Sequence, residues 1–157
     1  MNRRPSLLLA LPLSFFVAFL LAAMPLPQTL AYWRPEFVTM VLIFWVLNVP
    51  DRVGVWTAFI MGIALDVLLA TPFGVHPLTL ATLAYLARLS WRRVAVYSLL
   101  QTSGLVFALV LIGLMIKRLL LGIVATSPVS MLFWLPAFTS ALVWPTVMVF
   151  LRRFTRR

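Results

Sequence analysis

The chain has 157 residues, of which 64% are apolar and 10% charged, and its formal net charge is +10. Soluble domains contain about 45–50% apolar and about 25% charged residues, so this composition excludes an ordinary soluble domain. The 13% aromatic content excludes a disordered chain, and the lack of cysteine excludes disulfides, thiolate metal sites and thiol catalysis.

Long apolar stretches, divided by proline, glycine and arginine, predict helices that cross a membrane. A spanning helix needs roughly 20 mostly apolar residues. The apolar runs are continuous and lack the alternation of a lipid-facing barrel strand. The sequence therefore predicts an all-α membrane protein, a single polytopic domain over residues 1–157 with six transmembrane helices. These are residues 6–24, 29–49, 52–70, 76–90, 94–116 and 131–151.

The first segment follows Arg3 and Arg4 and ends in Leu21-Ala22-Ala23-Met24-Pro25, which imitates a secretory signal. A cleaved signal is normally followed by a hydrophilic mature protein, whereas more apolar segments follow here. We interpret this segment as an uncleaved first helix.

The second segment contains Arg34-Pro35-Glu36. Proline lacks an N–H and disfavours helix at the preceding residue, so a kink or a helix start is expected near the outer surface. Residues 37–49 alone would extend about 20 Å, so the helix is expected to begin before Pro35 or to lie in thinned bilayer. Arg34 and Glu36 would anchor the chain at the interface or contact a periplasmic partner.

Asp66 is the most informative residue of the third segment, because Gly54, Ala58 and Gly62 precede it at intervals of four. Such a small-residue series permits close helix packing, so Asp66 is expected to face protein. A carboxylate at this depth is costly unless it is paired or hydrated. Three roles are open for Asp66: it is held by His76, an arginine or backbone N–H groups; it binds a partner or acts as a switch; or it takes part in proton or ion transport.

His76, the only histidine, follows a tight outer turn that contains Gly74. We expect a hydrogen-bonded histidine and no metal site, because only Asp66 and Glu36 could complete one. The chain shows no activated serine, paired carboxylates or phosphate-binding glycine loop, so neither an enzyme nor a cofactor is expected.

The last two segments carry charged and proline residues at unusual places. Lys117 and Arg118 are expected to end the fifth helix and snorkel outward, with residues 119–124 along the membrane surface or against a partner. Pro136 and Pro145 are expected to interrupt the last helix, and Pro145, after Trp144, to kink it.

The basic residues predict the orientation. With both termini in the cytoplasm, ten basic residues lie inside and only Arg34, Lys117 and Arg118 outside, which follows the positive-inside rule. The surplus charge therefore indicates orientation and anionic phospholipids, and argues against nucleic acid as a partner. The ten are Arg3, Arg4, Arg52, Arg88, Arg92, Arg93, Arg152, Arg153, Arg156 and Arg157.

An ordered set of landmarks along nearly the whole chain resembles the MreD family of rod shape-determining membrane proteins. Two positions depart from it, because Phe44 stands where the family often has tyrosine and Ala70 where glycine is common. The landmarks are Met24-Pro25-Leu26-Pro27, Arg34-Pro35, Trp45, Pro50-x-Arg52-Val53, Met61-Gly62-x-x-Leu65-Asp66, Gly74-Val75, Ala84-Tyr85-Leu86, Leu142-Val143-Trp144-Pro145 and the basic tail after Leu151.

The resemblance implies a non-enzymatic component of the cell-elongation complex in the bacterial inner membrane. It implies MreC as a direct partner, and MreB, RodA and a class B penicillin-binding transpeptidase in the same machinery. It also implies a fold like the six-helix substrate-binding components of ECF vitamin transporters, which by itself says nothing of transport. The alternative is a small-molecule or lipid-binding module, with a polar pocket near the outer leaflet formed from Arg34, Glu36, Asp66, His76 and Gln101.

Overall fold

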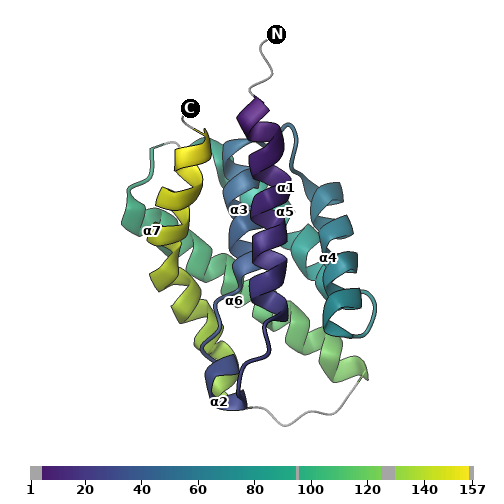
Figure 1. Ribbon diagram of the computed structural model, residues 1–157. Helices are drawn as coiled ribbons and strands as arrows, with labels where there is room; N and C mark the ends of the chain where they lie inside the picture. Colours follow the sequence, from purple (N-terminus) through teal and green to yellow (C-terminus); the bar gives the residue numbers. More distant parts are fainter. Residues whose placement is uncertain (1–4, 95, 125–129, 156–157) are drawn as a thin grey trace.

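The computed structural model describes residues 5–94, 96–124 and 130–155, and these form a bundle of helices with no strand among them (Figure 1). The all-helical prediction is confirmed. The two ends of the chain lie at one end of the bundle and the short α2 lies at the other. The long helices are α1 (Pro5–Ala23), α3 (Phe37–Asn48), α4 (Val55–Leu69), α5 (Val75–Val94), α6 (Leu99–Val124) and α7 (Leu135–Thr155); the short ones are α2 (Gln28–Ala31) and the 3-10 helix η1 (Met131–Trp134).

Within the described parts of the chain, two stretches are long and apolar enough to cross a membrane, Leu99–Ile123 and Met131–Arg153, with mean hydropathies of 2.3 and 1.5. Leu9–Ala23, Phe37–Asn48 and Val55–Leu69 are apolar but shorter. Large apolar side chains point outward over the bundle, and Trp56 and Leu100 are 81% and 83% exposed. A surface of this kind suits a lipid environment and not water.

Helix α3 is the centre of the bundle. Residues 38–46 are all buried, and α3 contacts α1, α5, α6 and α7. A helix that is apolar on every side is stable only where neighbours surround it, and α3 is covered in this way by protein. Its 12 residues extend about 18 Å.

The prediction of one helix over residues 29–49 is wrong, because α2 and α3 are separate and α3 begins at Phe37, after Pro35. The expectation that the helix begins before Pro35 is wrong as well. Proline disfavours helix at Arg34, and the backbone resumes hydrogen bonding with Met40 N–H donating to the Glu36 carbonyl.

The boundaries of α5 and α6 also differ from those predicted. Residues 91–93, which the prediction leaves between two helices, belong to α5, which continues to Val94, because arginine is a good helix former and suits the last turn. Helix α6 begins at Leu99 because Ser98 and Gln101 form a capping box, each side chain accepting a hydrogen bond from the other's backbone N–H. Helix α6 continues through Lys117 to Val124, so Lys117 does not end it.

Helix α7 continues through Pro145, so the predicted interruption there is wrong, while the predicted kink at Pro145 stays a prediction. Pro136 lies in its first turn, where a missing N–H costs nothing, and Pro145 lies inside the helix. The stretch from Met131 that was predicted as helix begins as η1, in which the Ser130 hydroxyl accepts a hydrogen bond from Leu132 N–H.

Helices α4 and α5 share the most extensive helix–helix contact of the described residues, and the small residues of α4 lie in it. Ala58 is fully buried, and a β-carbon on Gly62 would lie 2.3 Å from the Cα of Pro77. At the terminal end of the bundle, a β-carbon on Gly54 would lie 3.4 Å from Nη1 of Arg88. The small-residue face of α4 therefore packs within the bundle, against α5.

Candidate functional site: a polar cluster between the helices

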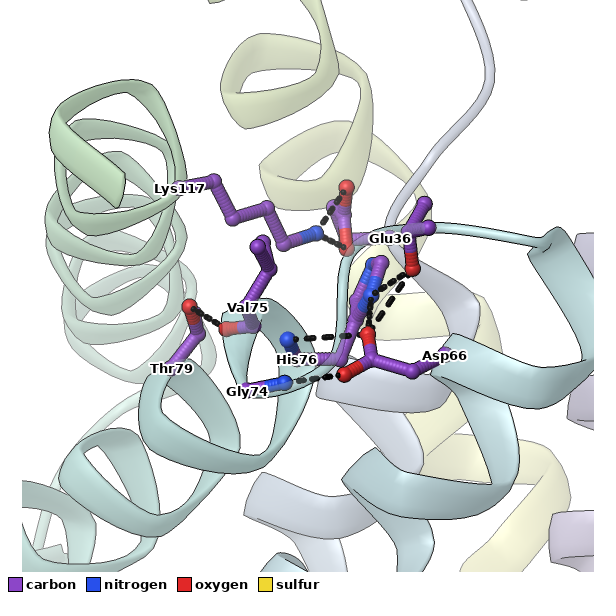
Figure 2. A network of polar contacts seen from close by, with 8 residues as sticks. Glu36, Asp66, Gly74, Val75, His76, Thr79 and Lys117 are labelled. Atoms are coloured by element: carbon purple, nitrogen blue, oxygen red, sulfur yellow. Dashed lines mark hydrogen bonds and ion pairs between the residues drawn. The ribbon is translucent and has the colours of Figure 1, made fainter. Parts of the chain in front are cut away.

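Asp66 lies in the last turn of α4, and its carboxylate is surrounded by donors (Figure 2). Oδ2 accepts a hydrogen bond from Gly74 N–H at 2.7 Å, and Oδ1 accepts from Thr71 Oγ1 at 2.8 Å. His76 contributes its backbone N–H at 3.2 Å and its ring nitrogen Nδ1 at 2.7 Å. Asp66 is buried, and these contacts compensate the loss of water around its charge.

The connection between α4 and α5 folds around this carboxylate. Ala70 ends α4 in the left-handed conformation with φ of 51°, and Gly74 has φ of 103°. The backbone N–H of Thr71 donates to the backbone carbonyl of Asp66 at 3.1 Å. Asp66 therefore holds the turn through its backbone carbonyl as well as through its side-chain carboxylate. The connection thus brings the N-terminus of α5 back onto Asp66.

A second pair, Glu36 and Lys117, joins segments 81 residues apart (Figure 2). Lys117 Nζ donates to Oε1 at 2.9 Å and to Oε2 at 2.8 Å. Glu36 also accepts from Thr39 Oγ1, and its backbone N–H donates to Ser140 Oγ at 2.9 Å. Glu36 therefore connects the start of α3 to α6 and α7.

Arg34 is bound to the end of α1. Its two terminal nitrogens donate to the carbonyl oxygens of Ala22, in the last turn of α1, and of Met24, the residue just after the helix. A cation at the C-terminal end of a helix is favourable, because the carbonyl dipoles point toward it. The side chain is half-buried, and its Nε is buried with no hydrogen-bond partner among the described residues.

Four of the polar side chains described above border a cavity of about 140 Å³ to which all six long helices contribute. Arg34, Glu36, His76 and Lys117 supply its polar wall. Leu65 and Leu69 of α4 and Pro136 of α7 belong to its apolar wall. Ala31 of α2 is part of its lining, so the cavity lies toward the α2 end of the bundle.

The structure brings together five of the predicted candidates: Arg34, Glu36, Asp66, Gly74 and His76. Pro35 also borders the cavity. Ala58 and Gly62 instead form the α4–α5 contact. Trp144 is buried in α7 next to Pro145, and its indole N–H has no hydrogen-bond partner among the residues described.

Gln101 was assigned to the outer polar group, and this is wrong, because it caps the start of α6. Lys117 was interpreted as an outward anchor, and this is also wrong, because its ammonium contacts Glu36. Its signal in the sequence was its position, beside Arg118, in a run that is otherwise uncharged from residue 94 to residue 151. Thr71, Thr39 and Ser140 carried no comparable signal.

The contacts of the cluster join α4 to α5 and the start of α3 to α6 and α7. Among residues 5–94, 96–124 and 130–155, no three histidine, aspartate or glutamate side chains gather as a metal site. Each carboxylate has its own donors, so neither is left as an evident general base.

The comparison with protein families and the comparison with individual proteins agree on one family. No solved structure matches the chain. Residues 3–154 match the family described as rod shape-determining protein MreD. The chain is 35% identical over 152 residues to the rod shape-determining protein MreD of Haemophilus influenzae, covering 92% of this chain and 90% of the relative. This is a family of shape-determining proteins, not of known enzymes, and a match over nearly the whole of both chains shows that the protein belongs to the MreD family.

Proposed function

We propose that the protein is a non-enzymatic integral membrane scaffold of the bacterial cell-elongation complex, which binds MreC and thereby supports peptidoglycan synthesis and cell shape. The observation that carries this proposal is the family match over residues 3–154. MreB, RodA and a class B penicillin-binding transpeptidase would belong to the same complex, with or without direct contact.

The proposed topology is six spans in the inner membrane with both termini in the cytoplasm. Two features support it: the six long helices, and the two chain ends at one end of the bundle. Arg88 lies against Gly54 at this same end, as the positive-inside rule requires. The polar cluster of Arg34, Asp66 and Lys117 would then lie toward the periplasm, the side on which MreC projects.

The alternative, a small-molecule or vitamin-binding module, is less well supported by the cavity. Sites for such ligands usually enclose about 300–1,000 Å³. The cavity here has about 140 Å³, which is too little for a vitamin-sized molecule.

The direct test is co-purification with MreC from detergent after co-expression, with an unrelated tagged membrane protein as the control. We expect MreC to elute with this chain, and we expect the chain to restore rod shape in cells that lack their own MreD. A folded chain that neither retains MreC nor restores cell shape would contradict the proposal.

A further inference from the structure

The positive charge of Arg34, on the wall of the cavity, has no carboxylate partner among the described residues. The chain has three acidic residues, Glu36, Asp51 and Asp66. Glu36 is paired with Lys117, and Asp66 is occupied by the α4–α5 connection and His76. Asp51 is exposed in the turn after α3, at the terminal end of the bundle. Among the described residues, no carboxylate therefore pairs with Arg34.

The contacts of Arg34 leave donors available. A guanidinium has five N–H groups, and two of them donate to the carbonyls of Ala22 and Met24. Carbonyl oxygens carry only partial charge, so the positive charge of the half-buried guanidinium is not neutralised. Lys117, on the same cavity wall, uses two of its three N–H groups on Glu36. A cavity with these donors is suited to an anionic oxygen ligand.

The neighbouring residues indicate the depth of the cavity. Tyr32 and Trp33 precede Arg34 directly and are 39% and 57% exposed. Tyrosine and tryptophan gather at the level of lipid headgroups, where the abundant anion is phosphate. The volume of about 140 Å³ equals that of four or five water molecules, at about 30 Å³ each. This space suits one headgroup fragment.

We propose that this cavity binds the phosphate group of a phospholipid headgroup, with Arg34 as the principal cation and Lys117 beside it. The inference uses the proposed membrane topology but not the binding of MreC. The lipid would neutralise Arg34 and join α1 to α6 and the start of α3. Free inorganic phosphate has the same chemistry, and the experiment separates the two sources.

The test is thermal unfolding of the full chain in neutral detergent, with short-chain phosphatidylglycerol, short-chain diacylglycerol or inorganic phosphate added. At a lipid concentration about ten times the Kd, phosphatidylglycerol is expected to raise Tm by roughly 3–5 °C. Diacylglycerol, which lacks the phosphate, should leave Tm unchanged. If inorganic phosphate alone reproduces the full rise, the lipid source is wrong; if diacylglycerol does so, the phosphate site is wrong.

Variants locate the effect. Arg34→Gln should abolish the rise, and Arg52→Gln, an exposed cation in the turn before α4, should retain it. Because Arg34→Gln also removes the contacts with α1, Ala31→Leu provides a second variant that narrows the cavity and keeps every charge. An unchanged rise in Ala31→Leu and in folded Arg34→Gln would overturn the proposal. The readout does not involve MreC, so this inference and the scaffold function can fail separately.

Discussion

Gly62 of α4 lies directly against the backbone of Pro77 in α5. A β-carbon on Gly62 would be 2.3 Å from Pro77 Cα and 2.4 Å from its nitrogen. These are backbone atoms at the start of a helix, so they cannot move aside as a flexible side chain would. Glycine is required at this position because a side chain would clash with α5, and not because the backbone needs a conformation that only glycine adopts.

Gly62→Ala is therefore expected to destabilise the protein by at least about 2 kcal/mol, since overpacking a dense contact costs about 1–3 kcal/mol or more. Unfolding of the purified protein in detergent measures the change. Gly104→Ala in α6 is the matched control, because its β-carbon would meet nothing within 4 Å. It should gain about 0.5–1 kcal/mol from helix propensity. Equal effects at the two glycines would contradict the packing argument.

Asp66→Asn and Asp66→Leu separate two properties of the carboxylate. The asparagine keeps one acceptor oxygen but presents an NH₂ to donors, and we expect it to lose about 1–3 kcal/mol of stability. The leucine leaves the N–H groups of Gly74 and His76 unpaired, so its loss should be larger. Asp51→Asn, at an exposed turn residue, should change stability by less than about 0.5 kcal/mol.

The same Asp66 variants test whether this residue contributes to assembly. If the role of Asp66 is to hold α4 to α5, the amount of MreC retained per folded molecule should be unchanged in Asp66→Asn. Loss of MreC from a folded variant would instead indicate a partner contact. If both substitutions leave folding, assembly and cell shape intact, Asp66 has no special role.

Ala70→Gly is expected to stabilise the protein. Ala70 has φ of 51°, a conformation that costs an alanine about 1–2 kcal/mol and a glycine almost nothing. The gain should be about 1 kcal/mol, visible as a higher midpoint of unfolding. Ala108→Gly, on an exposed face within α6, should cost about 1 kcal/mol, because glycine disfavours ordinary helix. A loss of stability in Ala70→Gly would argue against the left-handed end of α4.

A double-mutant cycle on Glu36 and Lys117 tests the connection between α3 and α6. The side chains are 26% and 11% exposed, so their coupling should exceed the 0–1 kcal/mol typical of surface pairs and reach about 1–3 kcal/mol. Glu36→Gln and Lys117→Met are the two single substitutions of the cycle. The midpoints of unfolding of the single and double variants provide the measurement. The exchanged pair Glu36→Lys with Lys117→Glu should recover part of the loss. Strictly additive effects would mean that the ion pair does not stabilise the bundle.

The backbone conformation of Ala70 gives a physical meaning to one of the two positions at which this chain departs from the family pattern. The family often has glycine where this chain has alanine, and a left-handed φ gives the physical reason. Phe44, the other departure, is fully buried and packs edge-on against Trp45 with ring centroids 5.4 Å apart. A tyrosine hydroxyl at this position would need a buried hydrogen-bond partner.

Several properties were readable from the sequence because they depend on composition and on spacing along one helix. The apolar composition predicted helices suited to a membrane, and the four-residue spacing of Ala58, Gly62 and Asp66 predicted a face packed against protein. Boundaries were less predictable where arginine or lysine was interpreted as a helix end. Arg92 and Lys117 lie inside helices, because a basic side chain is compatible with helical backbone.

Tertiary structure alone decided which distant residues meet. The sequence placed Asp66 and His76 near each other because they are ten residues apart, whereas Glu36 and Lys117 are 81 apart and had no visible relation. Likewise, the apolar composition of α3 predicted only a spanning segment, and the helices that pack around it make it the buried centre. Helical periodicity specifies which side chains share a face, but the partner of that face depends on how six helices pack together. The sequence by itself therefore determined the class of protein and the packing face of α4, and the packing of the bundle decided the polar cluster and its cavity.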